Sequence, residues 1–430
     1  MKSIFKFLGI IAFVAVIGFA MAACGNKSSG DPSGTPPDEL VFTDSAAFDI
    51  PANIIRTPIT NIDVSLGVSG GTPPYAYSAT GLPAGISISS TGIISGAPAS
   101  LGPAGTATIT VADSDAASKS ITIAYGIISP SVYAAGYYYT GGAPAYIACY
   151  WKDGVKTDLE NVLSQATAIT VVGSDVYIAG WYDNGTTSIA CYWKNGEKTD
   201  LSTVRSEAYA IAVVGSNVYV TGAYTMAYTA CYWVNTTQTV PTDGEPYVIA
   251  VDGSNVYFAG SYNNGGTTEA CYWKDGTLIP LPQPSSITYS YATAIAIVGS
   301  DVHIAGIYND GTDIPCYWVN GTTPTDLSTV GTMDATAIAV VGSDVYVAGN
   351  DQTTGLSSIA CYWKNGTKTN LSTVLSEALA IAVDGSDVYI VGRYWVGSGS
   401  GTIACYWKNG TKTDLSDDNA RATGIALMVE

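Results

Sequence analysis

Histidine and arginine are almost absent from this sequence of 430 residues. It contains one histidine, His303, and four arginines, Arg56, Arg205, Arg393 and Arg421. General acid–base catalysis, zinc binding and phosphate binding rely heavily on these two residue types. We therefore expect no enzyme, no catalytic residue, no metal site and no cofactor. Four scattered arginines also make an arginine cluster for a carboxylated sugar hard to assemble.

Charged residues are also scarce, at 12% of the chain, and most of them are acidic. Seventeen basic against 35 acidic side chains give a net charge of −18, which disfavours binding to nucleic acid. Hydrophobic residues reach 47%, so solubility must come from Gly, Ser, Thr, Asn and Tyr. This balance is typical of β-rich proteins outside the cytoplasm. The composition predicts an all-β fold.

The N-terminus carries an export signal. Two lysines precede an apolar run over residues 7–23, and small residues then lead to Cys24. The ending Met-Ala-Ala-Cys resembles the cleavage box of bacterial lipoproteins, which implies that Cys24 becomes a lipid anchor. An ordinary secretion signal or an uncleaved anchor is the alternative. Residues 25–39 are predicted to form a flexible tether. We expect a protein of the cell envelope, at the outer membrane or cell surface, that contacts the membrane through this lipid alone.

Residues 40–127 are rich in Pro, Gly, Ser and Thr between short alternating apolar stretches, which predicts a small β-sandwich. The stretch GGTPPYAYSATGLPAGISISSTGIISGAPA over residues 70–99 resembles the Ig-like, cadherin-like modules of bacterial surface proteins. That resemblance implies a spacer or an adhesive unit. Asp113 and Asp115 are interpreted as turn residues and not as metal ligands.

The tripeptide Cys-Tyr-Trp occurs seven times after residue 130. Its first residues are Cys149, Cys191, Cys231, Cys271, Cys316, Cys361 and Cys405. Each unit of about 43 residues is predicted to contain four strands, joined by Gly-Ser-Asp and Asn-Gly turns. In the second unit we place these strands at residues 168–172, 176–180, 189–194 and 198–201.

A four-stranded unit that is apolar on both faces must be covered by neighbours on both sides, so we expect the seven units to close into a ring. Residues 131–430 resemble bacterial β-propeller repeats of the VYVAG type. The first unit lacks its first strand and residues 421–429 supply one, which predicts a seven-bladed propeller closed by the C-terminal strand. The recurring cysteines and tryptophans are interpreted as buried packing residues, with free thiols.

The two short turns of each unit should share one face of the disc, and the loops of variable length should share the other. We expect ligand binding on the variable face. At its centre, the start of the innermost strand should place seven residues around the mouth of the channel. They are Gln165, Glu207, Glu245, Tyr291, Asp334, Glu377 and Arg421. Four of them are carboxylates, which suits a cation or sugar hydroxyls, although they could simply cap a solvated turn.

Aromatic residues follow the second strand of most units. They are Tyr138, Trp181, Tyr182, Tyr224, Tyr262, Tyr308, Tyr394 and Trp395, with Tyr137 and Arg393 beside them. Such rings can stack on sugars, or they can pack at the blade edge. A surface binding or adhesion module for a glycan or a peptide is the function we expect, as a monomer. The alternative is a scaffold for an envelope complex, and a glycoside-processing enzyme comes third.

Overall fold

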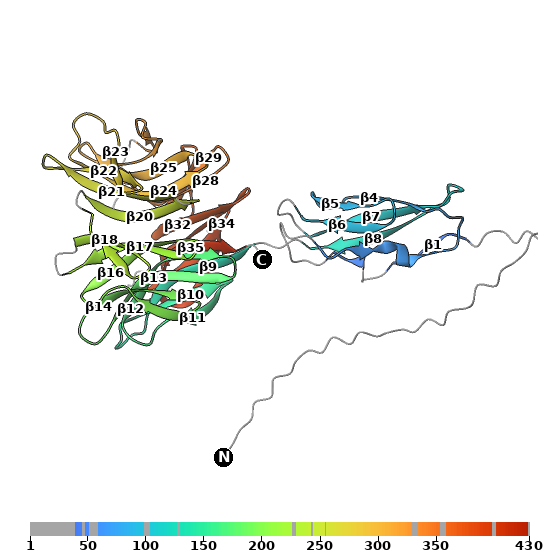
Figure 1. Cartoon of the computed structure of the whole chain (residues 1–430), viewed down its shortest axis with the longest axis horizontal. Helices are drawn as coiled ribbons and strands as arrows, with labels where there is room; N and C mark the ends of the chain where they lie inside the picture. Colours follow the sequence, from blue (N-terminus) through green and yellow to red (C-terminus); the bar gives the residue numbers. More distant parts are fainter. Residues whose placement is uncertain are drawn as a thin grey trace, which may run out of the picture.

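The structure is a computed structural model that describes residues 39–44, 48–50, 59–98, 104–126, 130–225, 229–241, 244–253, 255–328, 333–352, 358–397 and 401–428. The predicted export signal, Cys24 and nearly all of the predicted tether lie outside these residues, so the structure does not test them. The described residues form an all-β protein in which a small sandwich precedes a propeller (Figure 1). Within these ranges there is no helix of the length and apolarity needed to cross a membrane.

The Ig-like sandwich is built from three small antiparallel sheets. Their strand orders are β1-β3, β2-β6-β5 and β4-β7-β8. The strands are β1 (Val41–Phe42), β2 (Ile62–Asp63), β3 (Val68–Ser69), β4 (Ala76–Thr80), β5 (Ile86–Ile88), β6 (Ile93–Gly96), β7 (Gly105–Ala112) and β8 (Ser118–Tyr125). Alternate residues of β7 and β8 point inward, including the fully buried Ile109 and Ile123. Asp113 has the predicted turn role, because its carboxylate accepts hydrogen bonds from the backbone amides of Thr72, Asp115 and Ala117.

The seven repeat units form the blades of the propeller, and each blade is an antiparallel sheet. Blade 1 contains β9 (Ser131–Tyr139), β10 (Tyr146–Lys152) and β11 (Val155–Asp158). Blade 2 contains β12 (Ser164–Val172), β13 (Asp175–Asp183), β14 (Ser188–Lys194) and β15 (Glu197–Asp200). Blade 3 contains β16 (Ser206–Val214), β17 (Asn217–Tyr224), β18 (Thr229–Val234) and β19 (Thr237–Thr239). Blade 4 contains β20 (Glu245–Asp252), β21 (Asn255–Asn264), β22 (Thr267–Lys274) and β23 (Thr277–Pro280).

The remaining blades repeat this pattern. Blade 5 contains β24 (Tyr289–Val298), β25 (Asp301–Asn309), β26 (Asp313–Val319) and β27 (Thr325–Asp326). Blade 6 contains β28 (Met333–Val341), β29 (Asp344–Asp351), β30 (Ile359–Lys364) and β31 (Thr367–Asn370). Blade 7 contains β32 (Ser376–Asp384), β33 (Asp387–Trp395), β34 (Thr402–Lys408) and the first part of β35 (Thr411–Met428). In every blade the strands are hydrogen-bonded to their sequence neighbours.

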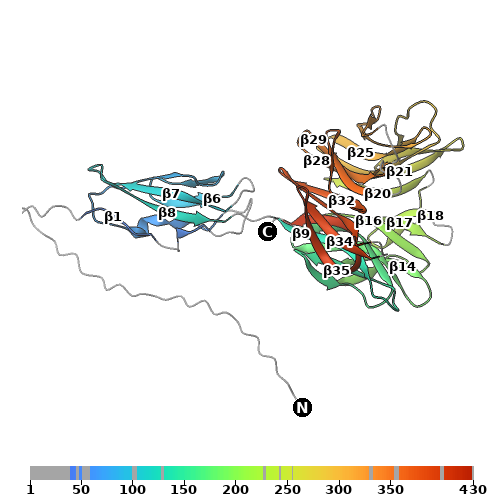
Figure 2. The ribbon, with the colours of Figure 1, turned by 180° about the vertical axis from the view of Figure 1, so that it is seen from behind.

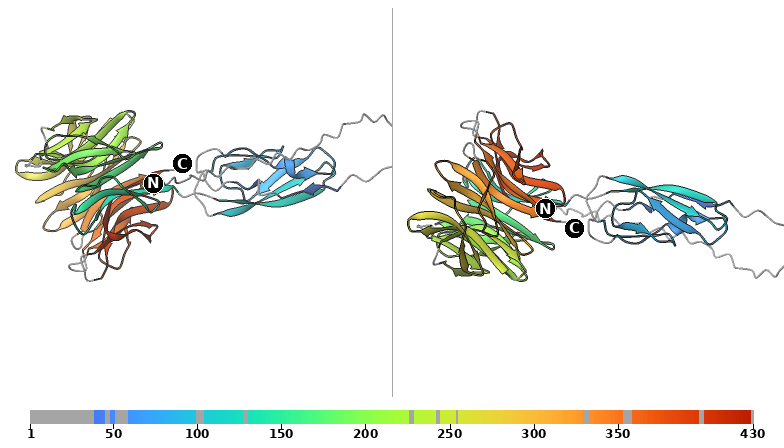
Figure 3. Two further views of the ribbon diagram at one scale, coloured as in Figure 1. Left: turned by 90° about the horizontal axis from the view of Figure 1, so that it is seen from below. Right: turned by 90° about the horizontal axis from the view of Figure 1, so that it is seen from above.

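The C-terminal strand closes the ring as the sequence predicts. The second part of β35 pairs with β9, with Ile425 opposite Ala134 and Ala426 opposite Tyr133 (Figure 2). Each innermost strand contacts the innermost strand of the next blade, and the last of these contacts joins β35 to β12. The first and last blades are therefore adjacent (Figure 3). Closure leaves no blade with an uncovered apolar face.

The turns follow the predicted chemistry, but the inner strands are longer than predicted. Asn195 and Gly196 both have positive φ, at 52° and 87°, as a type I′ hairpin turn requires. The first strand of blade 2, predicted from residue 168, begins at Ser164. The prediction was wrong there because a β-bulge between Ala166 and Ala168 interrupts the alternation from which a strand is recognised in sequence.

The seven cysteines of the repeat are buried free thiols, as predicted. Burial raises the pKa of each thiol, to about 12 for Cys231 and Cys361. Six of the seven tryptophans that follow them are at most 1% exposed, whereas Trp273 is 5% exposed. Each tryptophan packs within the seam between its own blade and the preceding one, for example Trp233 with Leu201. The Cys-Tyr-Trp repeat is thus part of the scaffold.

Candidate functional site

The seven residues predicted at the channel mouth occupy equivalent places in the seven blades. Each lies at the start of the innermost strand, directly opposite the residue that follows a glycine on the second strand. Gln165 is opposite Trp181, for instance, and Glu377 is opposite Arg393. Side chains that face one another across a strand pair share one face of the sheet. The residues that face the mouth series therefore belong to the same surface.

A glycine sets the backbone geometry at each mouth residue. In all seven blades a Cβ atom added at this glycine would lie within 1.8–2.1 Å of the mouth residue's carbonyl oxygen. The glycines are Gly136, Gly180, Gly222, Gly260, Gly306, Gly349 and Gly392. Because no side chain fits there, the bulged inner strand can lie close against the second strand.

Hydroxyl groups around the mouth join one blade to the next, a role that was not predicted from the sequence. Ser164 is fully buried and accepts a hydrogen bond from the amide of Ala148 in the preceding blade. Thr167, at the bulge, donates to the carbonyl of Ala208 in the following blade. Equivalent threonines are Thr293, Thr336 and Thr423. These bonds give the mouth a rigid frame.

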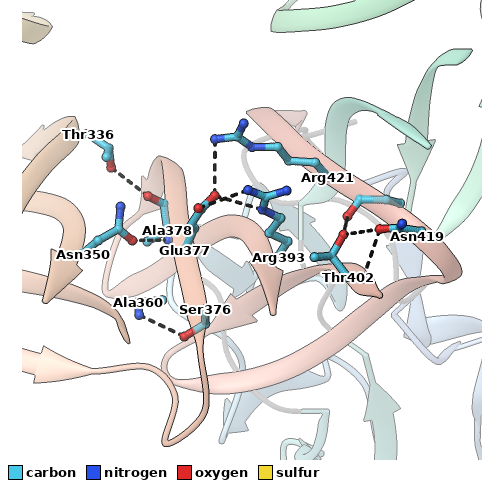
Figure 4. Close-up of polar contacts among 11 residues, drawn as sticks. Thr336, Asn350, Ala360, Ser376, Glu377, Ala378, Arg393, Thr402, Asn419 and Arg421 are labelled. Atoms are coloured by element: carbon cyan, nitrogen blue, oxygen red, sulfur yellow. Dashed lines mark hydrogen bonds and ion pairs between the residues drawn. The ribbon is translucent and has the colours of Figure 1, made fainter. Parts of the chain in front are cut away.

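The carboxylates at the mouth are not equivalent. Arg393 binds Glu377 through two hydrogen bonds, of 2.9 Å from Nε and 3.1 Å from Nη2. Arg421 reaches the same carboxylate from blade 1, with 3.3 Å between Nη2 and Oε2. Figure 4 shows Glu377 between the two arginine side chains. An arginine cluster is hard to assemble from four scattered residues, but ring closure brings two of them together across the seam between blades 7 and 1.

Two other mouth carboxylates are held in a less polar setting. Burial raises the pKa of Glu207, with a smaller opposing effect from Arg205. Burial also raises the pKa of Asp334, and the negative charges of Asp313 and Glu377 add to this effect. Ionisation of either side chain therefore lowers the stability of the folded protein. Glu245 differs, since its carboxylate accepts a hydrogen bond of 2.7 Å from the hydroxyl of Tyr247.

Replacing Asp334 with asparagine should stabilise the propeller at neutral pH. The folded-state pKa of Asp334 lies above its unfolded value, so the folded chain binds the proton more tightly and stability falls as pH rises through that window. The gain from Asp334→Asn should therefore be present at pH 7 and absent near pH 3, below both pKa values. Thermal unfolding followed by tryptophan fluorescence at the two pH values measures it.

Asp344→Asn is the matched control with the opposite sign. Hydrogen bonds from Lys364 and Asn365 lower the pKa of Asp344. Its ionised form therefore stabilises the folded chain above the unfolded pKa, and this contribution disappears as pH falls through the folded pKa. Asp344→Asn should lower the melting temperature at pH 7. If Asp334→Asn also lowered it, Asp334 would not be destabilised by its surroundings.

Most of the predicted tyrosines are engaged within their own blades. The hydroxyl of Tyr182 donates to Asp200 at 3.1 Å, and the Lys198 ammonium lies 3.3 Å from the centre of its ring. Tyr138, Tyr308 and Tyr394 bind an outer-strand aspartate in the same way, and Tyr262 binds Glu269. Tyr224 packs against the core between blades 2 and 3. These contacts occupy the hydroxyl groups that a sugar would need.

Trp395 and Tyr137 instead line a pocket of about 460 Å³ between blades 7 and 1. The centre of the Trp395 ring lies 4.5 Å from the Arg393 guanidinium carbon. Tyr137 and Tyr146 meet edge to face, with 5.4 Å between their ring centres. The other lining residues are Tyr139, Thr402, Asn419, Ala420 and Arg421. This blade 7–1 pocket combines aromatic rings with charged and amide groups, and the loops of variable length surround it.

Two polar residues of this pocket were not predicted from the sequence. The backbone amide and the hydroxyl of Thr402 both donate to Oδ1 of Asn419, at 3.1 and 2.6 Å. These bonds fix the orientation of the Asn419 amide. Thr402 is the first residue of β34, and Asn419 lies on β35. The position two residues before the mouth series varies between units, and this variation at Asn419 was the available signal.

A second pocket, of about 240 Å³, opens between blades 3 and 4. Six units have a buried or partly buried leucine ten or eleven residues after the cysteine, such as Leu201. Blade 3 has Pro241 at this position, and Pro241 lines the pocket with Phe258 and Trp273. The missing leucine explains why Trp273 is more exposed than its six counterparts.

No group of three or more His, Cys, Asp or Glu side chains that could hold a metal ion occurs among the described residues. Glu377 is neutralised by two arginines, and Glu245 is bound by Tyr247. The mouth is therefore not a uniform ring of free carboxylates.

Comparisons with solved structures give distant likenesses. A puromycin-hydrolysing peptidase of Mycobacterium tuberculosis aligns over 59% of this chain and 52% of its own, with 13% identity and a TM-score of 0.35. TolB from Acinetobacter baumannii aligns over 84% of both chains, with 9% identity and a TM-score of 0.34. The acylaminoacyl peptidase of Pyrococcus horikoshii aligns over 74% of this chain and 51% of its own, with 9% identity and a TM-score of 0.38. This chain thus spans about half the length of each peptidase.

The sequence comparisons bear on the N-terminal part alone. No curated protein matches the chain. The family described as Putative Ig domain matches residues 41–127, which agrees with the resemblance seen in the sequence. The family match thus identifies the sandwich as an Ig-like domain and does not extend to the propeller that carries the pocket.

Proposed function

We propose that this chain is a lipid-anchored protein of the cell envelope that binds a glycan in the blade 7–1 pocket, by recognition and not by catalysis. The export signal and Cys24 support the anchor, and the tether and Ig-like domain would hold the propeller away from the membrane. The observation that carries the proposal is the composition of the pocket. Aromatic rings such as Trp395 can stack on the faces of sugar rings, while the amide NH2 of Asn419, whose oxygen accepts from Thr402, can donate to a sugar hydroxyl.

The place of the pocket supports the same function. Tyr139 and Tyr146 flank one variable loop, and Trp395 and Thr402 flank another. Asn419 lies on the closing strand, β35. The frame beneath them is the repeated scaffold, so these loops can differ without disturbing the fold. Specificity built in variable loops on a rigid scaffold is typical of recognition proteins.

The full chain in detergent should bind members of a glycan array, and Trp395→Ala should weaken the affinity for the best ligand about tenfold, the loss expected for one stacked ring. Trp181→Ala is the matched control, because Trp181 also lies outside the Cys-Tyr-Trp series but does not line the pocket. Calorimetry measures both affinities. The proposal would be wrong if no glycan bound, or if Trp181→Ala cost as much as Trp395→Ala. A protein partner recovered by pull-down in the absence of glycan binding would favour the scaffold role.

A further inference from the structure

We infer that the sugar bound in the blade 7–1 pocket carries a carboxylate, an inference that rests on the proposed function. The pocket is a basic site in an acidic protein. The chain has a net charge of −18 and only four arginines, yet two of these, Arg393 and Arg421, line this one pocket. Apart from Arg421, the other six mouth residues are acidic or uncharged.

Glu377 uses only part of what the two arginines offer. A guanidinium has five N–H donors in a planar fork; Glu377 accepts two hydrogen bonds from Arg393 and forms an ion pair with Arg421. Nε of Arg421 is buried and has no hydrogen-bond partner among the residues that the structure describes. A buried donor without a partner lowers stability, so an incoming acceptor is favoured at this place.

The charges in contact point to the same ligand. Among the described side chains in direct ionic contact here, two guanidinium groups share one carboxylate, so these contacts contain one more positive than negative charge. A ligand with one carboxylate would balance this positive charge. An uncharged sugar would instead leave the excess positive charge unpaired and partly removed from water. Arginine binds carboxylates through paired, parallel hydrogen bonds, which also fix the orientation of the ligand.

The aromatic residues place this charge beside a sugar ring. The Arg393 guanidinium lies over Trp395, at 4.5 Å from the ring centre, so its plane is held. Tyr137, Tyr139 and Tyr146, on β9 and β10, also line the pocket, and Tyr137 is the cross-strand partner of Arg421. A pyranose ring stacked on these tyrosines would bring a ring carboxylate toward the arginines. A uronic or sialic acid has this arrangement of an acid on a ring.

Oligomers of galacturonate, glucuronate and sialic acid, each compared with its methyl ester, test the inference. The ester keeps the rings and removes the charge. For at least one pair, the full chain should bind the acid at least tenfold more tightly than the ester. Arg393→Gln and Arg421→Gln should each reduce the ratio of the acid affinity to the ester affinity to about twofold or less. Arg205→Gln, on the same face but outside the pocket, should change neither affinity.

Arginine side chains also provide a direct readout. Protein labelled with ¹⁵N-arginine has four Nε–Hε signals, one for each arginine. The acid should shift the signals of Arg393 and Arg421 and leave those of Arg56 and Arg205 in place. Equal affinity for acid and ester in every pair would overturn the inference, as would an arginine-independent preference for the acid. Neutral glycans that bind and depend on Trp395 while no acid is preferred would leave the proposed function standing. No glycan binding at all would overturn both.

Discussion

Replacing Gly180 with alanine should lower the melting temperature of the propeller by about 5–10 °C, which corresponds to about 3 kcal/mol. A Cβ atom at this position would lie 2.1 Å from the carbonyl oxygen of Gln165, 3.0 Å from Cα of Ala166 and 3.0 Å from the Trp193 ring. Two of these three contacts are with backbone atoms, so no side-chain rotation can relieve them. The bulged inner strand would have to move away from the second strand.

Two other glycines separate this steric effect from the general cost of removing a glycine. Nothing lies within 4 Å of a Cβ atom at Gly142, and its φ is not positive, so Gly142→Ala should be neutral. Gly173 has φ of 60° in an open turn, and Gly173→Ala should cost about 1 kcal/mol. All nine tryptophans lie in the propeller, so their fluorescence reports its unfolding without the sandwich. Equal losses for Gly180→Ala and Gly173→Ala would contradict the close approach.

The sequence predicted the fold well because the fold is repeated. Seven copies of Cys-Tyr-Trp fix the number of blades, and Asn-Gly turns such as Asn195–Gly196 fix the hairpins. Closure could also be predicted, since one strand was missing at the start of the repeat and one was left over at its end. The limits of the strands were predicted less accurately. In every blade a bulge interrupts the two-residue period of the innermost strand, and in blade 2 this bulge lies at Thr167.

The site could be predicted only in part. Placing Glu377 opposite Arg393 follows from the register that the repeat implies, and Arg393 is a departure from the pattern. The approach of Arg421 does not follow, because it comes from the next blade and depends on how the seam closes. The pocket also depends on the hydrogen bond between Thr402 on β34 and Asn419 on β35, which the repeat does not predict. Sequence patterns therefore located the face of the disc but not the cavity within it.

The closing strand makes the seam and the pocket depend on one another. Arg421 lies on β35, and Thr423, two residues later, donates to the carbonyls of Ala135 at 3.1 Å and Ala166 at 2.9 Å. The same strand thus fills blade 1, ties it to blade 2 and carries one of the two arginines. Closing the ring assembles the site that we propose.

A chain that ends after Leu415 should therefore lose the cooperative unfolding of its propeller, or melt about 20 °C or more below the full chain. Residues 420–428 provide the innermost strand of blade 1, and without them β9 has an unpaired edge. The buried Ala420 and Ala422 would leave a gap against Trp151 and Val391 in the core of the seam. Tryptophan fluorescence and near-UV circular dichroism measure the loss.

A chain that ends after Met428 is the control, because Met428 is the last residue of β35 paired with β9, and it should melt like the full chain. A synthetic peptide of residues 416–430 added to the shorter chain should restore the transition, since its strand can pair with the free edge of β9. The same peptide with Ile425→Asp should fail, because Ile425 packs in the seam between blades 7 and 1. If the shorter chain melted normally without the peptide, blade 1 would be stable with three strands. Closure would then contribute the arginine on β35 to the pocket and would not be needed for the stability of the ring.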